Sequence, residues 1–266
     1  MNAAHPLVAA GTRAFLVIAH PGHELRIHGW LETVRPHVFV LTDGSGRPGR
    51  SRLASTSRIL AATGSQPGSI YGRFSDIALY DAILDGKHEA FQALTLDFAD
   101  ALTRVRPQYV VGDALEGYNP VHDVCRLIIN VAVAICSRRG NPPVGNFDFP
   151  LVGRPDAAPQ EPSAAVVGLR LQESQLARKL AAAHGYAELD HEIKSALQEN
   201  SVDGFRDEWL RPVEGSGYTP PKLPPYYETH GERQVAAGHY ARVLRYHEHV
   251  LPVVDTLLDW AESQAI

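Results

Sequence analysis

Apolar runs that alternate with amphipathic stretches dominate the first half of the chain. Residues 14–19, 37–42 and 109–112 are short apolar runs typical of buried strands. In residues 87–105, apolar side chains recur at three- and four-residue intervals, as they do on one face of a helix. Strands and helices in alternation predict an α/β fold, with a mainly parallel sheet covered by helices on both faces.

The remaining elements are less regular. Further helices are expected at 24–34, 51–63, 124–135, 173–184, 189–198 and 235–260, and a short strand at 69–72. Residues 138–165 are expected to form a long excursion, and the proline-rich residues 211–227 an extended crossing segment. Pro252 should kink or break the last helix. We expect one domain over residues 1–266, with a core at about 13–140 and a helical C-terminal extension at about 166–266.

The composition is that of an ordinary globular protein, with 44% hydrophobic and 21% charged residues. A net charge of -5 gives no indication of a nucleic-acid or anionic-membrane partner. No stretch approaches the roughly 18 apolar residues of a membrane span, and the first residues lack the pattern of a signal peptide. Cys125 and Cys136 share a predicted helix about 16 Å apart, too far for a disulfide. Reduced thiols fit a cytoplasmic protein. The expected partner is a small-molecule substrate, with a homo-oligomer left open.

Two histidine motifs each follow a predicted strand. Residues 19–24 read Ala-His-Pro-Gly-His-Glu, and residues 119–123 read Asn-Pro-Val-His-Asp. In open α/β sheets the ligand crevice lies outside the carboxyl ends of the strands. His20, His23 and His122 can therefore meet at one point, and three histidines plus a water form an accepted catalytic zinc set. The motifs predict a metal-dependent hydrolase.

At these motifs the chain resembles the PIG-L/LmbE-like family of zinc-dependent N-deacetylases, over roughly residues 14–135. The family opens with Ala-His-Pro-Asp-Asp-Glu and closes with His-Pro-x-His. Between them, its Thr-Asp-Gly is matched by residues 42–44, which include Asp43. Its Arg-x-x-Glu helix and the glycine twelve residues after the arginine are matched by Arg52 and Gly64, with Ser55 in place of the glutamate; a later aspartate corresponds to Asp76. The resemblance implies a Rossmann-like fold.

The resemblance also implies roles at the site. His20, His23 and His122 correspond to the zinc ligands, with His23 in place of a carboxylate. Gly22 stands where the family has its general base, and a glycine cannot accept a proton. Asn119 stands where a histidine helps to stabilise the oxyanion, and an amide can still donate a hydrogen bond there. The implied reaction is removal of an N-acyl (acetyl) group from an amino sugar, a sugar conjugate or a related metabolite.

Because Gly22 cannot act as the general base, another group must accept the proton of the attacking water. Asp123 and Asp43 are favoured because both lie near predicted strand ends. Glu228 and His230 are alternatives, since the polar run 226–233 can fold back over the site. If Glu228 is the base, Glu228→Gln should abolish turnover and leave the metal content intact.

Four further residues are expected around the reacting groups. Arg52, Asp76 and Glu116 are candidates for substrate binding, although Arg52 could equally form a surface ion pair. Glu24 is expected to orient a metal ligand from behind.

Two alternatives remain open. The lost base at Gly22 is compatible with a family member that retains a metal or ligand pocket and acts as a binding or accessory protein. The glycine pattern of residues 44–49 is compatible with a Rossmann-like nucleotide-binding enzyme, although it follows the second strand rather than the first.

Overall fold

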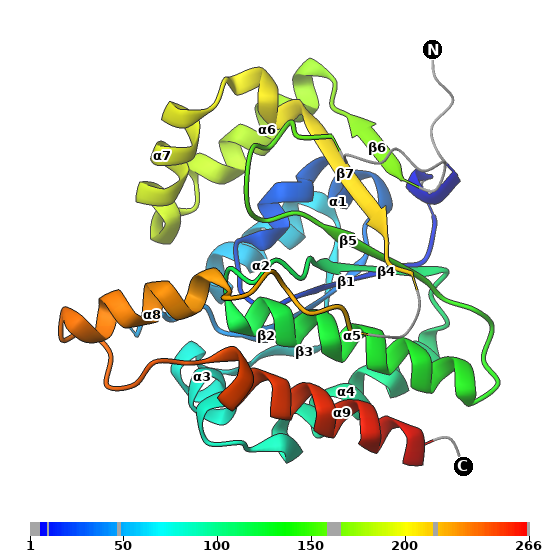
Figure 1. Ribbon diagram of the computed structural model, residues 1–266. Coiled ribbons are helices and arrows are strands. Elements are labelled where there is room, and N and C mark those ends of the chain that lie inside the picture. Colours follow the sequence, from blue (N-terminus) through cyan, green and yellow to red (C-terminus); the bar gives the residue numbers. More distant parts are fainter. Residues whose placement is uncertain (1–5, 10, 47–48, 159–165, 215–217, 265–266) are drawn as a thin grey trace.

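A computed structural model describes residues 6–9, 11–46, 49–158, 166–214 and 218–264 (Figure 1). Its centre is a seven-stranded sheet in the order β3-β2-β1-β4-β5-β7-β6. The strands are β1 (Ala14–Ile18), β2 (His37–Thr42), β3 (Gln66–Phe74), β4 (Tyr109–Asp113), β5 (Gly145–Phe149), β6 (Val167–Arg170) and β7 (Asp207–Pro212). Strands β1 to β5 are parallel, whereas β7 pairs antiparallel with both β5 and β6. The expected α/β fold with a mainly parallel sheet is confirmed.

Helices cover both faces of this sheet (Figure 1). On one face lie α1 (His28–Val34), α2 (Leu53–Thr63), α6 (Glu173–His184) and α7 (Asp190–Glu199); on the other lie α3 (Asp76–Leu84), α4 (His88–Val105), α5 (Pro120–Arg138) and α9 (Leu251–Ser263). Alternate residues of β1 enter two separate cores: Phe15 and Val17 pack in one, Leu16 and Ile18 in the other. Both faces of the strand are therefore buried, which explains its unbroken apolar sequence.

Helix α5, which begins with the second histidine motif, is deeply buried. By length and composition it is the one helix in the described ranges that could cross a membrane, but 83% of the relevant window is buried inside the protein. A core helix enclosed by neighbouring elements meets the same criterion.

The sheet order places the two histidine motifs together. From β1 the chain moves outward to β2 and β3 on one side, while β4 and β5 lie on the other side of β1. The strand order therefore reverses between β1 and β4, and ligands bind at the carboxyl ends of strands at such a reversal. The residues after β1 and β4 are those of the first and second motifs.

Several predicted elements differ from the structure. The third strand is longer than residues 69–72, and α3 and β5 were not expected. The C-terminal extension contributes two strands, β6 and β7, as well as helices. Strand β6 has only four residues, and β7 buries the charged Glu208 on its inner side, so neither has the apolar sequence expected of a buried strand. The single-domain boundaries stay a prediction.

The helix expected at 235–260, with a kink or break at Pro252, is not a single helix in the structure. Helix α8 spans Tyr226–Ala236, and a separate π-helical turn η5 (Tyr246–Val250) leads into α9. Pro252 lies in the first turn of α9, where its missing N–H is not needed by the helix. The 3₁₀ turns are η1 (Pro6–Val8), η2 (His23–Ile27), η3 (Ala187–Leu189) and η4 (Val202–Arg206).

Candidate functional site

The three histidines of the two motifs lie together at the carboxyl ends of β1 and β4. Their ring centres are 5.5 Å apart for His20 and His23, 5.2 Å for His20 and His122, and 4.5 Å for His23 and His122. Two imidazoles bound to one tetrahedral zinc ion have ring centres about 5 Å apart, given Zn–N distances of about 2.1 Å. The spacing of the rings is therefore that of a three-histidine metal site.

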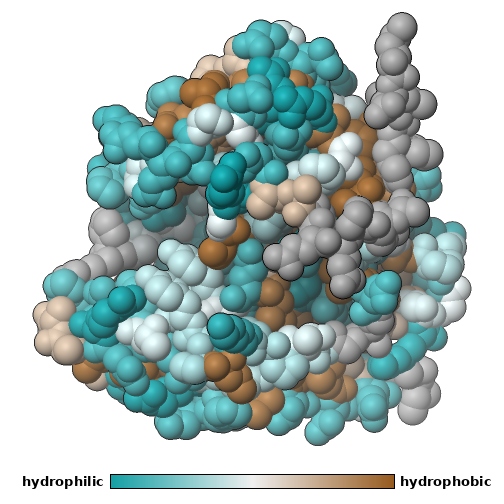
Figure 2. Space-filling model, turned by 45° about the horizontal axis from the view of Figure 1, so that its top comes forward, coloured by the Kyte–Doolittle hydropathy of each residue, from teal (hydrophilic) through white to brown (hydrophobic). Residues whose placement is uncertain are grey.

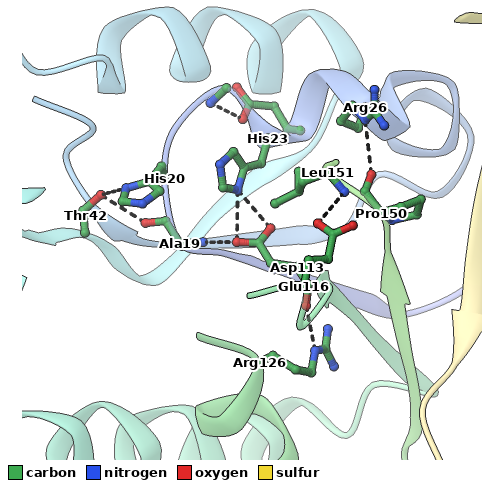
Figure 3. Close-up of polar contacts among 12 residues, drawn as sticks. Ala19, His20, His23, Arg26, Thr42, Asp113, Glu116, Arg126, Pro150 and Leu151 are labelled. Carbon is green, nitrogen blue, oxygen red and sulfur yellow. Dashed lines mark hydrogen bonds and ion pairs between the residues drawn. The ribbon is translucent and has the colours of Figure 1, made fainter. Parts of the chain in front are cut away.

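The His20 ring is hydrogen-bonded by two side chains, of which Figure 3 shows that of Thr42. Its Nδ1 lies 2.8 Å from the Thr42 hydroxyl and 2.9 Å from Asp76 Oδ1. A carboxylate only accepts hydrogen bonds, so Nδ1 carries the proton and Nε2 retains its lone pair. Nε2 is buried and has no hydrogen-bond partner among the described residues. Carboxylate support of this kind is usual for metal-binding histidines.

Asp76 also ties this arrangement to the loop after β2. Its Oδ2 accepts the Gly46 N–H at 2.7 Å. Burial raises the pKa of Asp76, but hydrogen bonds from His20, Thr42 and Gly46 and the electrostatic influence of the His20 ring outweigh it. The pKa of Asp76 therefore lies well below its usual value. Asp76 therefore hydrogen-bonds the side of the His20 ring that faces away from Nε2. The role that the sequence suggested for Asp76, substrate binding, stays a prediction.

His23 has a second carboxylate behind it, that of Asp113. Its Nδ1 lies 3.0 Å from both Asp113 oxygens, and Oδ2 also accepts the Ala19 N–H at 2.7 Å (Figure 3). The Nδ1–H of His23 is thus fixed, and its Nε2 is again the nitrogen with a free lone pair. The sequence places Asp113 at a strand end but does not reveal this role.

His122 lies in the first turn of α5 and is buried, with 7% of its surface exposed. Burial lowers its pKa well below the usual value, and the neighbouring His23 and His20 lower it further. The ring is therefore neutral at neutral pH, the form that binds metals. Its Nδ1 is buried without a hydrogen-bond partner in the described part of the chain.

The spacing of the three rings suits a metal ion, but the side chains do not yet form a complete binding site. Among the described residues, no group of three or more His, Cys, Asp or Glu side chains is arranged to hold a metal ion as it stands. The residue types, the carboxylate supports and the free nitrogens fit a metal.

Gly22 lies between the first two histidines with φ = +109°, a conformation that favours glycine. A Cβ added there would lie 2.5 Å from Leu189 Cδ1. A side chain at position 22 would therefore require the Leu189 side chain of η3 to shift. Glu24 is fully buried, and it accepts hydrogen bonds from the Gly22 N–H and the Thr56 hydroxyl, both at 2.7 Å. It holds the loop that carries the histidines, rather than bonding a ring directly.

Asp123, the favoured replacement base, is fully buried. Its Oδ1 accepts the N–H groups of Glu116 and Gly117 at 3.1 Å, and its Oδ2 has no described partner. Burial, and then the charge of Glu116, raise its pKa to about 7 despite those two hydrogen bonds. Burial and then the Asp123 charge raise the pKa of Tyr218 and Tyr227, so the carboxyl lies near these tyrosines. Its role as the base stays a prediction.

Asn119 is the N-cap of α5. Its side-chain oxygen accepts the Val121 N–H at 2.9 Å. The cap fixes the first turn of the helix that carries His122. A contribution of its amide to an oxyanion stays a prediction.

The other candidate residues have structural contacts. Asp43 Oδ1 accepts the Ser45 N–H at 2.9 Å, which shapes the turn after β2. Glu116 accepts the N–H groups of Leu151 and Val152. The Arg52 side chain runs beside Gly44 and Pro21, next to the first motif. Of these residues, Arg52 is the one placed beside the histidine loop, so a substrate contact remains its predicted role.

Glu228 and His230 lie on α8. Glu228 Oε1 accepts the Tyr246 N–H at 2.7 Å and thereby supports the start of η5. The His230 ring lies 5.7 Å from that of Tyr226, which stacks on Tyr118. The contacts described for both residues join C-terminal elements to one another and to the loop before α5.

In the glycine-rich loop of residues 44–49, Arg47 and Pro48 lie outside the described residues. The Ser45 N–H donates to Asp43, the Gly46 N–H to Asp76 and the Gly49 N–H to Ser45 O. A phosphate group would need such N–H groups free. This observation gives no support to nucleotide binding.

The fold, but not the sequence, connects the chain to known proteins. No family model matches it, and no curated protein does. Among solved structures, the A40926 pseudoaglycone deacetylase Dbv21 is 19% identical, with a TM-score of 0.51 over 79% of this chain and 99% of Dbv21. The zinc-inhibited form of teicoplanin deacetylase Orf2 is 13% identical over 76% of this chain and 97% of that one, and the conserved protein TT1542 from Thermus thermophilus is 17% identical over 78% and 95%, both with a TM-score of 0.48. At these identities the likeness to Dbv21 shows a shared fold.

Proposed function

We propose that the protein is a zinc-dependent hydrolase that removes an N-acyl group from an amino sugar, a sugar conjugate or a related metabolite. The observation that carries this proposal is the paired support of His20 by Asp76 and of His23 by Asp113. Each pair fixes the proton on Nδ1 and leaves Nε2 for a metal, and the neutral ring of His122 lies beside them. The fold shared with a deacetylase agrees with this proposal.

Each candidate residue would have a distinct role in the proposed reaction. His20, His23 and His122 would hold zinc, which when bound lowers the pKa of water and polarises a carbonyl group. Asn119 would donate a hydrogen bond from its side-chain N–H₂ group to the oxyanion, and Arg52 would contact the sugar. Asp123 and Asp43 are the first residues to test as proton acceptors, since Gly22 cannot fill that role.

The first experiment is elemental analysis of the purified protein beside His23→Ala and His122→Ala, with His191→Ala as a control on the exposed surface of α7. About one zinc per chain, lost in the two site variants and kept in the control, is the expected result. Release of acetate from N-acetylglucosamine conjugates, lost with the zinc, would then establish hydrolysis. A protein that takes up no zinc contradicts the proposal.

A second candidate function rests on Gly22. Because Leu189 occupies the space beside Gly22, the chain could bind a metal or ligand without catalysing hydrolysis. Zinc binding without hydrolysis across a panel of N-acyl sugars favours this accessory role.

A further inference from the structure

Helix α5 carries a buried arginine one turn after His122. Arg126 is only 2% exposed, whereas charged side chains ordinarily lie at the surface, and hydrophilic residues cover much of the surface seen in Figure 2. Residues four positions apart lie on the same side of a helix. The guanidinium group therefore lies inside the protein, on the side of α5 that carries a candidate metal ligand.

The guanidinium group joins α5 to two strands of the sheet. Its Nε donates to the main-chain carbonyl oxygen of Asp113, at the end of β4, at 2.7 Å (Figure 3). In β5, the Phe147 carbonyl oxygen and the Asn146 side-chain oxygen accept from the two terminal nitrogens at 3.1 and 2.9 Å. These three acceptors are uncharged oxygens. Since apolar residues can often replace a buried charged network without loss of stability, stability alone does not account for an arginine here.

Strand β4 has a glycine where the arginine passes. A Cβ added at Gly112 would lie 2.8 Å from a terminal nitrogen of Arg126 and 2.3 Å from Ile129 Cδ1. Glycine within a strand weakens it and often marks a close approach of another group. Gly112 directly precedes Asp113, so the strand gives up a side chain at the position that lets α5 and its arginine approach the supporting carboxylate.

We propose that Arg126 is a positioning residue that holds His23 and His122 at the spacing needed to share a metal ion. Asp113 presents its carbonyl oxygen to Arg126 and its carboxylate to His23, so one residue connects the arginine to the first motif. Arg126 itself belongs to the helix that begins with the second motif. The two rings, whose centres are 4.5 Å apart, are thereby fixed relative to each other. The effect on zinc rests on the proposed function, whereas the effect on the His23 ring does not.

Nitrogen-15 NMR of the metal-free protein tests this connection without zinc. At slightly alkaline pH, where an imidazole is neutral, the His23 ring of the wild type should carry its proton on Nδ1. In Arg126→Met the Asp113 carboxylate is no longer held in place, so we expect a mixture of the two neutral tautomers. Arg138→Met is the matched control, because Arg138 donates to the Ala261 carbonyl oxygen at the other end of α5, and it should give the wild-type spectrum.

Competition with a chromogenic chelator measures the consequence for the metal. We expect zinc to bind about tenfold more weakly to Arg126→Met, and with unchanged affinity to Arg138→Met. Arg126→Lys keeps a charged donor and should lie between Arg126→Met and the wild type in both measurements. A folded Arg126→Met protein with the wild-type tautomer or the wild-type zinc affinity overturns the proposal.

Two further outcomes also decide the matter. If Arg126→Met fails to fold, Arg126→Lys takes its place, because one ammonium group cannot reproduce the contacts of a guanidinium with both strands; a wild-type spectrum and affinity in that variant overturn the proposal. A wild-type protein that binds no zinc, with a changed His23 tautomer in Arg126→Met, contradicts the proposed function and supports the positioning of His23 by Arg126.

Discussion

The Nδ1 atom of His23 lies 3.0 Å from each carboxylate oxygen of Asp113, a side chain with none of its surface exposed. The same carboxylate accepts the Ala19 N–H from the end of β1. Because Asp113 is shielded from water, solvent does not compete with this ring for the carboxylate. One buried carboxylate therefore fixes both the tautomer of His23 and the position of the first motif relative to β4.

Asp113→Asn should weaken zinc binding about 10- to 100-fold, as removal of a supporting carboxylate does elsewhere. An amide can still accept the Ala19 N–H, but it no longer presents two anionic oxygens to His23. Competition with a chromogenic chelator measures the affinity, and Asp100→Asn, on the surface of α4, is the control. Equal affinities in all three proteins would show that Asp113 does not support a metal ligand.

Gly22→Ala should destabilise the protein more than Gly153→Ala. Both glycines have positive φ, +109° and +88°, but an added Cβ meets nothing within 4 Å at Gly153 and lies 2.5 Å from Leu189 at Gly22. Backbone strain should lower the free energy of unfolding by about 1–2 kcal/mol in both variants. Overpacking should add about 1–3 kcal/mol at Gly22.

Urea denaturation measures the loss of unfolding free energy in Gly22→Ala and in Gly153→Ala. Leu189→Ala combined with Gly22→Ala should recover the overpacking part, so the two substitutions should not be additive. Equal destabilisation by the two glycine variants would mean that Leu189 moves aside freely, and Gly22→Asp would then become a realistic way to introduce a base.

Lys179→Met should lower the free energy of unfolding by about 3–5 kcal/mol, because it leaves the buried Glu208 without its counter-ion. Burial lowers the pKa of Lys179, and the charge of Glu208 opposes that effect. Glu208 also accepts the N–H groups of Gly29 and Trp30 in the first turn of α1.

The matched control is Arg178→Met, on the same helix. Arg178 pairs with Glu32 at 2.6 Å, but its side chain is 55% exposed, so its loss should lower the free energy of unfolding far less than Lys179→Met does. Urea midpoints compare the two variants. A similar small effect in both would show that water reaches the Lys179–Glu208 pair.

Glu228→Gln should retain the fold and, where turnover is measurable, most of that turnover. The glutamine still offers an oxygen to the Tyr246 N–H, whereas Glu228→Ala removes it and should cost about 1 kcal/mol of stability. Thermal unfolding and acyl-release assays separate the two variants. Abolished turnover in a folded, zinc-loaded Glu228→Gln protein would instead support the sequence-based hypothesis that Glu228 is the base.

Local patterns predicted those parts of the fold that depend on neighbouring residues. The unbroken apolar runs of β1, β2 and β4 and the helical spacing in α4 were sufficient to place these elements. In open α/β sheets, ligands bind at the carboxyl ends of the strands. This rule and the predicted strands were sufficient to predict that His20, His23 and His122 lie together.

Features that depend on distant partners were not predictable in this way. Asp113 and His23 are 90 positions apart, and nothing local distinguishes a carboxylate that supports a histidine from one that caps a turn. Strand β6 has only four residues, and β7 carries three charged residues and a terminal proline, so neither is the unbroken apolar run that placed β1, β2 and β4. The packing of Leu189 against Gly22 likewise arises from tertiary structure. Hydrophobic periodicity and secondary-structure propensity describe only neighbouring residues, so they do not predict it.

The adjacency of β1 and β4 has a consequence for folding. Ala19 and Asp113 are separated by 94 positions, so no short fragment of the chain contains both sides of the histidine cluster. The cluster exists only when the centre of the sheet is assembled. A ligand bound there is linked to the global unfolding equilibrium rather than to local fraying, so its binding energy adds to the stability of the whole sheet.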